Sequence, residues 1–287
     1  MKFRTAIPIP IFPFQISFDD RIMSLGSCFS EHTANFLSDH RFCVHANPFG
    51  ILFNPLSISL SIDLLIKKEK LSDNYFQFFE DKWVSFAHHG KFSHSEKQTF
   101  ISNIQNQLAK AQDDLLQATI LFITFGTAFY YYHKEKKIVV ANCHKIPQAA
   151  FEKKCASIGE IVDAFQPFFE WKKRKNPDLK VIFTVSPVRH LGDGFHENTL
   201  SKSVLHLAVA ELVGHDNCFY FPSYEIFNDD LRDYRFYEKD LCHPSAQGIE
   251  FMQEILLQSL FPQQTRQQIQ IIEKENKMLN HRALYCE

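Results

Sequence analysis

The chain has 287 residues, of which 45% are hydrophobic and 22% are charged, so it can bury an ordinary globular core. Its formal net charge of −2 excludes a strong overall attraction to nucleic acid or to an anionic membrane surface. No run in the sequence approaches the roughly 20 apolar residues of a membrane span. We therefore expect a single domain over residues 1–287 that acts on a small or neutral molecule, without nucleic-acid or membrane partners.

The cysteines and the first residues indicate the compartment. Seven cysteines are scattered without a CxxC pair, and their odd number leaves at least one unpaired. The first fourteen residues carry two basic side chains, but prolines interrupt them, so they lack the continuous apolar segment of a signal peptide. We expect a cytoplasmic protein in which residues 1–20 form an extended arm.

Residues 21–31 predict a short apolar strand, a glycine and the start of a helix. Gly26 permits a tight bend, and Ser27 lies at the turn, where free N–H groups of a helix N-terminus favour negative charge. Ligands of open α/β sheets bind beyond the carboxyl ends of the strands. Ser27 is therefore a candidate nucleophile, although small residues also occupy such turns for structural reasons. Cys28 is the alternative, because a thiolate at a helix N-terminus can have a lowered pKa.

The next elements are a strand at 42–46, a turn-rich segment at 47–55 and a helix at 56–70. A hairpin is predicted over 75–86. The histidines that follow it, at 88, 89 and 94, have no carboxylate or HxxxH frame beside them. We expect neither a metal site nor a cofactor.

A second series of elements brings further candidates to the edge at which Ser27 lies. Residues 118–125, after a polar helix at 96–116, form a continuous apolar run that is typical of a central parallel strand, and Gly126 and Thr127 follow it. A hairpin over 129–141, a helix over 157–171 and a strand over 180–186 come next, and the last of these presents Arg189 and His190. Arg189 is suited to bind a substrate carboxylate or phosphate, or to form a structural ion pair.

The last part of the chain predicts a helix from Asn198 to about residue 214, with Ser201 and Lys202 on the surface. A fifth strand at 218–221 and helices at 245–259 and 263–282 complete the order. We predict an α/β fold with a three-layer, doubly wound, mainly parallel five-stranded sheet and hairpin insertions. The C-terminal helical extension over 263–287 either docks on the domain or pairs subunits in a homo-oligomer.

The segment Asp240-Leu-Cys-His243 places an aspartate three positions before a histidine. Residues three apart on a loop or a first helical turn can face each other, so Asp240 can hold one ring nitrogen of His243 and leave the other free. His243 is preferred to His190 as a base because no carboxylate stands so close before His190.

These residues carry a resemblance to a known family. Gly26-Ser27-Cys28-Phe29-Ser30 resembles the signature of the GSCFA family, which has alanine at the fifth place, and the segments 47–51, 124–127, 186–190 and 240–244 also resemble stretches of that family. The family resembles the SGNH, or GDSL-type, hydrolases, in which a serine after the first strand and a late DxxH form a triad. This resemblance implies that Ser27, Asp240 and His243 fill those roles.

One stretch departs from the SGNH pattern. Where those enzymes carry GxND after the third strand, this chain has Gly126-Thr127-Ala128-Phe129. The SGNH pattern implies an oxyanion hole made by the N–H groups of Ser27 and Gly50 and by the side chain of Asn47, and either Asn47 or Thr127 replaces the missing asparagine. Gly126, Thr127, Arg189 and His190 are candidate substrate contacts.

The leading hypothesis is a serine hydrolase that cleaves an ester, such as an acyl group on a carbohydrate or another small molecule. An acyltransferase would use the same residues with an alcohol in place of water. The rival is a non-catalytic binding module that keeps the fold and the pocket. Ala128 favours the binding module, whereas the set of Ser27, Asp240 and His243 favours the enzyme.

Overall fold

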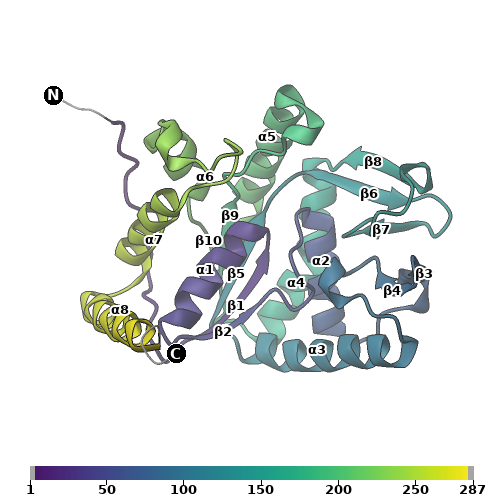
Figure 1. The fold of residues 1–287 in the computed structure, drawn as a ribbon, viewed down its shortest axis with the longest axis horizontal. Coiled ribbons are helices and arrows are strands. Elements are labelled where there is room, and N and C mark those ends of the chain that lie inside the picture. Colours follow the sequence, from purple (N-terminus) through teal and green to yellow (C-terminus); the bar gives the residue numbers. More distant parts are fainter. Residues whose placement is uncertain (1–3, 284–287) are drawn as a thin grey trace.

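The computed structural model describes residues 4–283, and its centre is a five-stranded parallel sheet (Figure 1). Across the sheet the strands are β10 (Cys218–Tyr220), β9 (Lys180–Val185), β5 (Ile120–Phe125), β1 (Arg21–Gly26) and β2 (Cys43–Ala46). Read from the β2 edge and numbered along the chain, the order is 2-1-3-4-5, which is typical of doubly wound folds. The predicted α/β fold class is confirmed.

Helices cover both faces of the sheet, and this explains why β5 is buried along its whole length. On one face lie α2 (Pro55–Lys67), α3 (Lys97–Gln117), α4 (Ile158–Lys175) and α5 (Phe195–Leu212). On the other face lie α1 (Cys28–Asp39) and α7 (Ala246–Leu260). The three layers are helices, sheet and helices, as a doubly wound fold requires.

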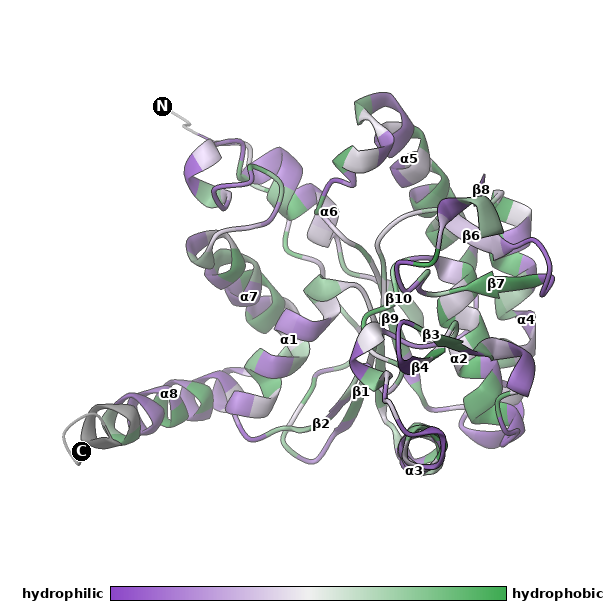
Figure 2. Ribbon diagram, turned by 45° about the vertical axis from the view of Figure 1, so that its right-hand side comes forward, coloured by the Kyte–Doolittle hydropathy of each residue, from purple (hydrophilic) through white to green (hydrophobic). Residues whose placement is uncertain are grey.

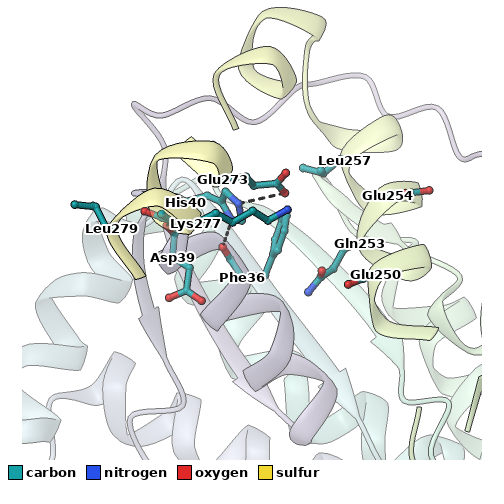
Figure 3. A pocket seen from close by; sticks show the side chains of 11 residues that line it. Phe36, Asp39, His40, Glu250, Gln253, Glu254, Leu257, Glu273, Lys277 and Leu279 are labelled. Carbon is teal, nitrogen blue, oxygen red and sulfur yellow. Dashed lines mark hydrogen bonds and ion pairs between the residues drawn. The ribbon is translucent and has the colours of Figure 1, made fainter. Parts of the chain in front are cut away.

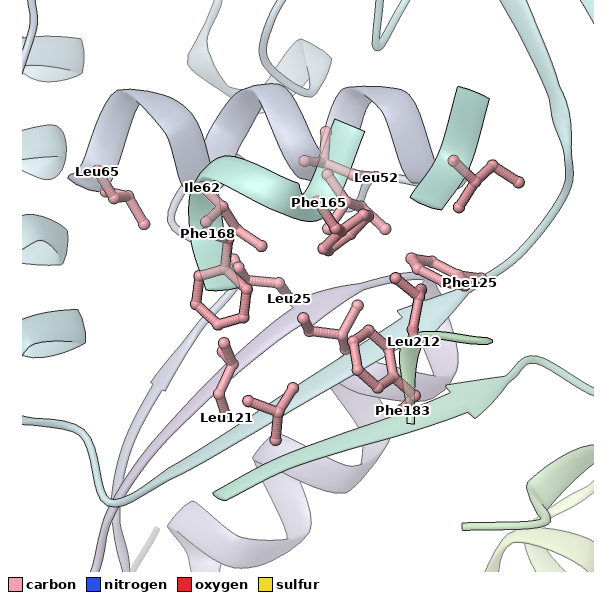
Figure 4. Packing of buried hydrophobic residues seen from close by; sticks show 14 of the residues in the cluster. Leu25, Leu52, Ile62, Leu65, Leu121, Phe125, Phe165, Phe168, Phe183 and Leu212 are labelled. Carbon is pink, nitrogen blue, oxygen red and sulfur yellow. The ribbon is translucent and has the colours of Figure 1, made fainter. Parts of the chain in front are cut away.

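The strand side chains alternate between two apolar clusters. Leu121 and Phe125 of β5 point toward α2, α4 and α5, where they pack with Phe165 and Phe183 (Figure 4). Phe122 of the same strand belongs to the cluster under α1 and α7. Successive side chains of a strand point to opposite faces of the sheet, so a continuous apolar run supplies apolar side chains to both clusters.

Two small antiparallel sheets lie beside the main one. The predicted hairpin of β3 (Phe76–Phe79) and β4 (Lys82–Ser85) is present. So is the hairpin of β6 (Phe129–His133) and β7 (Ile138–Val140), and β8 (Phe151–Cys155) pairs with the free edge of β6. The sequence did not predict β8, because its Glu-Lys-Lys centre is polar and mostly exposed.

The N-terminal arm and α8 (Gln263–Ala283) lie outside the layers. Ile16 is fully buried, and its N–H donates to the carbonyl of Leu260 at 2.7 Å. Hydrophilic residues run along α8, interrupted by hydrophobic ones (Figure 2), and Ile269 is buried against the domain whereas Met278 is 65% exposed. The predicted pairing of subunits through this helix stays a prediction, and residues 1–3 and 284–287 of the two predicted extensions lie outside the described part. None of the helices in residues 4–283 is both long and apolar enough to cross a membrane.

The start of α5 corrects the sequence-based prediction. The helix begins at Phe195, after Gly194 with φ of +98°, so Asn198 lies inside it and does not cap it. Ser201 and Lys202, which we expected on the surface, are 1% and 2% exposed. The short helix α6 (Ser223–Glu225) and a long irregular segment then lead from β10 to α7.

Candidate active site

Ser27 is the N-cap residue of α1 at the carboxyl end of β1. Gly26 before it has φ of +136°, and a Cβ atom there would lie 2.2 Å from the carbonyl oxygen of Thr124, so this close approach requires glycine. N-cap serines usually accept a hydrogen bond from the helix, but the Ser27 hydroxyl does not. It is buried, and no residue of the described chain bonds its Oγ. Such an unpartnered hydroxyl needs an explanation, and a reacting group supplies one.

The position of Ser27 in the sheet agrees with this interpretation. β1 pairs with β5 on one side and with β2 on the other, and the strand order reverses here. The helix after β1 covers one face of the sheet, whereas α4, which follows β5 and its hairpin, covers the other. Ligands of doubly wound folds bind in the crevice at this switch point.

Asp240 and His243 are in contact, as their spacing predicted. Oδ2 of Asp240 lies 2.5 Å from Nδ1 of His243, and Oδ1 accepts the backbone N–H groups of Cys242 and His243, each at 2.9 Å. These hydrogen bonds, from the His243 backbone first, lower the pKa of Asp240 to about 2. The carboxylate is therefore ionised and orients the imidazole with Nε2 left free. Both side chains are 51% exposed.

His190 lies at the strand ends, beside Gly126. A Cβ atom at Gly126, just after β5, would be 3.4 Å from Nε2 of His190. Burial, then the charge of Lys202 and, more weakly, that of His243 lower the pKa of His190 to about 4. The helices α1 and α7 both begin at this edge (Figure 1). Gly126 and His190 thus lie together at this edge. The segment of His243 is linked to it through Tyr237, which pairs with Pro244 and packs on Phe227, but no hydrogen bond joins His243 to the hydroxyl of Ser27.

Asn47, after β2, carries a buried donor that has no partner among residues 4–283. Its Oδ1 accepts the N–H of Gly26 at 2.9 Å, which fixes the amide so that Nδ2 points the other way. Nδ2 is this unpartnered donor. The other two predicted oxyanion donors already bond inside the fold, because the Ser27 N–H donates to Thr124 O at 3.2 Å and the Gly50 N–H donates to Asn47 O at 2.7 Å. Asn47 is the predicted donor that remains available.

Comparison with protein families shows the family to which this chain belongs. The model of the GSCFA family matches residues 21–255, from the start of β1 into α7. This chain belongs to the GSCFA family. The matched range contains Ser27, Asn47, Asp240 and His243. No curated protein matches the chain.

Two polar side chains of helix α5 in this GSCFA protein bond the loops that follow β5 and β9. These contacts were not predicted from the sequence. Lys202 is buried, and its Nζ donates to the carbonyl oxygens of Gly126 and Ser186, each at 2.6 Å. Ser201 Oγ accepts the N–H of Ala128 at 2.8 Å and lies 3.0 Å from Thr127 Oγ1. Thr127 is thereby held inside the fold. The loops after β5 and β9 are fixed by side chains of one helix.

A signal for this face was present in the sequence. Asn198, Ser201 and Lys202 continue with helical spacing into Leu205, Ala208, Val209 and Leu212, which are all buried. Asn198 Oδ1 accepts the N–H of His190 at 3.0 Å, so this polar residue also bonds a loop of the site. A polar segment that extends an apolar helix face indicates buried polar partners.

Two titratable side chains near Ser27, Lys202 and Cys28, have shifted pKa values. Burial lowers the pKa of Lys202 to about 7; the nearby Cys28 opposes this shift and Arg189 adds to it. Burial also raises the pKa of Cys28 itself, the opposite of what a thiolate nucleophile needs. The raised pKa thus disfavours the thiolate form of Cys28, although backbone hydrogen bonds and the charge of Lys202 oppose the rise.

A cavity of about 590 Å³ lies beside the site. Phe53 forms one wall of it, and the carbonyl of Phe53 accepts the N–H groups of Gly126 and Thr127. The same ring packs edge-on against His190 at 5.6 Å between ring centroids. The opposite walls come from the chain of β6 to β8, including Tyr131 and Phe151. Space for a substrate group is thus available next to the strand ends.

A larger cavity, of about 810 Å³, lies between α1, α7 and α8 (Figure 3). Phe36 and His40 line it from the last turn of α1, whereas Ser27 precedes the first turn. At 1.5 Å per residue the two ends of α1 are separated by about 20 Å. This cavity is therefore remote from Ser27, whereas the smaller cavity is lined by Phe53, which bonds the loop after β5.

The histidines after the first hairpin have structural contacts. His88 is buried, its Nδ1 lies 2.8 Å from Ser85 Oγ, and burial lowers its pKa to about 3. His94 Nδ1 accepts the N–H of Glu96 at 3.0 Å. Within residues 4–283 no group of three or more His, Cys, Asp or Glu side chains is arranged to hold a metal ion.

Proposed function

We propose that this GSCFA protein hydrolyses an ester, with Ser27 as nucleophile, His243 as general base and Asp240 as the group that orients His243. The observation that carries the proposal is the buried Ser27 hydroxyl at the switch point of the sheet, which bonds no residue of the described chain. The contact between Asp240 and His243 supports it. The resemblance of the motifs to SGNH hydrolases supports the same assignment of roles.

In the proposed reaction, Ser27 Oγ attacks the acyl carbon while its proton moves to Nε2 of His243. The negative charge that develops on the carbonyl oxygen is stabilised by Nδ2 of Asn47 and by the N-terminus of α1. The carbon–oxygen bond of the ester then breaks, and the alcohol leaves with the proton from His243. Water, deprotonated by His243, releases the acid and restores Ser27. An acyltransferase would use an alcohol at this last step.

The proposal requires the segment of Asp240 and His243 to approach Ser27 when substrate binds. Ser27 is 1% exposed, whereas the His243 side chain is 51% exposed and does not bond it. Catalytic hydrogen bonds often tighten only in the substrate complex. The backbone bridge between Tyr237 and Pro244 ties the two ends of this segment together.

A second candidate function is a binding module that retains the pocket without effective chemistry. The observation that favours it is the use of the Ser27 and Gly50 N–H groups inside the fold, together with Ala128 at the place of the SGNH asparagine. Without the N–H groups of Ser27 and Gly50 in the oxyanion hole, turnover should be slow, because loss of one oxyanion donor costs about 3 to 4 kcal/mol of barrier.

A fluorophosphonate probe distinguishes the two functions. We expect the probe to label the wild-type protein and the Cys28→Ala variant, and not Ser27→Ala, because only Ser27 is activated by His243. Circular dichroism and thermal melting confirm that each variant is folded. A folded wild-type protein that takes up no label contradicts the hydrolase and supports the binding module. Acetylated sugars and short p-nitrophenyl esters then identify the preferred acyl and alcohol groups.

A further inference from the structure

Arg189, in the loop after β9, has a guanidinium group that forms no ion pair with any residue of the described range 4–283. Its one side-chain hydrogen bond is a long one, from Nη2 to the amide oxygen of Asn228 at 3.3 Å. A partly buried arginine normally finds a carboxylate or another planar acceptor for its fork of N–H groups. Most of the donors of Arg189 therefore remain available for a ligand.

The acidic residues in the neighbouring segment already have other partners. Asp229 pairs with Arg232 at 3.2 Å and Asp230 pairs with Arg4 at 3.1 Å. Glu225 accepts the hydroxyl of Tyr220 at 2.7 Å. None of these three carboxylates therefore forms an ion pair with Arg189.

Arg189 lies near the segment that carries the proposed base. It bonds Asn228, the adjacent Phe227 packs on Tyr237 at 4.8 Å between ring centroids, and Tyr237 pairs with Pro244, the residue after His243. The charge of Arg189 acts on Cys242, the residue before His243, and on Tyr224 and Tyr237, in each case opposing the rise in pKa that burial causes. Arg189 directly precedes His190, whose ring contacts Phe53 at the wall of the neighbouring cavity. A group bound to Arg189 would lie at the mouth of the site, next to the segment that carries His243.

A second basic side chain, Lys202, lies in the same region. Lys202 bonds two carbonyl oxygens, and among the described residues it pairs with no carboxylate. Arg189 and Lys202 are close enough for the charge of one to act on the other. The positive charge of Arg189 thus disfavours the protonated form of Lys202, and an anion bound at Arg189 would remove part of that cost.

We propose that Arg189 binds an anionic group of the substrate, a carboxylate or a phosphate. This rests on the proposed ester hydrolysis for the kind of molecule that carries the group. The binding of the anion itself depends only on Arg189 and its surroundings. Carboxylate and phosphate both match the two parallel N–H groups of the guanidinium.

The test measures binding in the Ser27→Ala variant, so that no turnover interferes. Isothermal titration calorimetry compares three acetate esters, namely 3-acetoxypropanoate, 2-acetoxyethyl phosphate and the neutral 2-methoxyethyl acetate. We expect at least one anionic ester to bind about 10-fold to 100-fold more tightly than the neutral one, because charge-assisted bidentate hydrogen bonds contribute that much. The stronger of the two anionic ligands identifies the group as carboxylate or phosphate.

Substitution of Arg189 should remove this preference and leave the affinity for the neutral ester unchanged. Arg189→Met in the Ser27→Ala background removes the charge, whereas Arg189→Lys should retain part of the preference as a point charge. Arg232→Met, which removes an exposed arginine that is paired with Asp229, is the matched control and should leave the preference intact. Added salt should weaken the binding of the anionic ester alone, a readout that needs no substitution at position 189.

The outcomes separate this inference from the proposed function. Equal affinity for all three esters, or an anionic preference that survives in Arg189→Met, overturns the role of Arg189 even if Ser27 takes up the fluorophosphonate. Failure of labelling, with the anionic preference intact and lost in Arg189→Met, contradicts the hydrolase and leaves the anion site in place.

Discussion

Lys202 offers a test of the electrostatics of the site, because it is buried at 2% exposure without an ion pair in the described chain. Burial lowers its pKa in the folded protein to about 7, whereas its ordinary value is 10.5. Between these two values the unfolded chain binds a proton at this side chain and the folded protein does not. The free energy of unfolding must therefore rise with pH across this interval.

Comparison with Lys202→Met isolates this contribution, since methionine has a similar length and does not titrate. The wild-type free energy of unfolding, minus that of the variant, should increase by about 2 kcal/mol from about pH 7 to about pH 9. Below about pH 7 the difference in the free energy of unfolding should level off, because Lys202 is then protonated in both the folded and the unfolded state. In the folded protein the cost of burying the charged ammonium is partly offset by its two hydrogen bonds, which contribute about 1 kcal/mol each.

Urea denaturation under reducing conditions, followed by the fluorescence of the two tryptophans, measures both proteins at each pH. Lys172→Met is the matched control, because Lys172 is also buried and donates to two carbonyl oxygens. Asp216 and Asp178 lie near Lys172 and oppose the lowering of its pKa, so its difference should rise less. A difference for Lys202 that stays flat between the two pH values would refute the reasoning, since it would show that the carbonyl oxygens of Gly126 and Ser186 keep the ammonium charged.

Three further substitutions test the remaining parts of the site. Gly26→Ala should lower the free energy of unfolding by about 3 kcal/mol or more in urea titrations, because its Cβ would lie 2.2 Å from Thr124 O at a φ of +136°; a shift below about 1 kcal/mol contradicts the close approach. Asn47→Asp keeps the acceptor for the Gly26 N–H and loses the Nδ2 donor, so kcat for a p-nitrophenyl ester should fall about 100-fold to 1,000-fold with little change in KM; an unchanged kcat excludes Asn47 from the oxyanion hole. Asp240→Asn should lower kcat by about 100-fold or more, because the wrong tautomer of His243 is then stabilised, and full activity of the folded variant rules out the proposed role of Asp240.

The sequence predicts most reliably those features whose partners are close along the chain. The continuous apolar run of β5 can be recognised in the sequence, because a strand that is buried on both faces carries apolar side chains at successive positions. The contact of Asp240 with His243 follows from a spacing of three residues. Both predictions depend on local geometry and need no knowledge of the tertiary structure.

The features that the sequence analysis missed depend on distant partners. Lys202 is buried because the carbonyl oxygens that it bonds, at Gly126 and Ser186, follow two separate strands. Strand β8 forms because β6 offers it a free edge, although its own residues are mostly polar and exposed. Neither local propensity nor periodicity contains this information, and the final packing overrides the local preference.

The chain of β6 to β8 forms a module that is inserted between β5 and α4. It supplies most of the walls of the cavity beside the site, whereas Ser27, Asn47 and His243 come from other segments. Laboratory evolution could therefore diversify this hairpin sheet by itself, reshaping the room for one end of a bound molecule while the proposed reactive groups keep their supports. Such a library offers a direct route from this scaffold to altered selectivity.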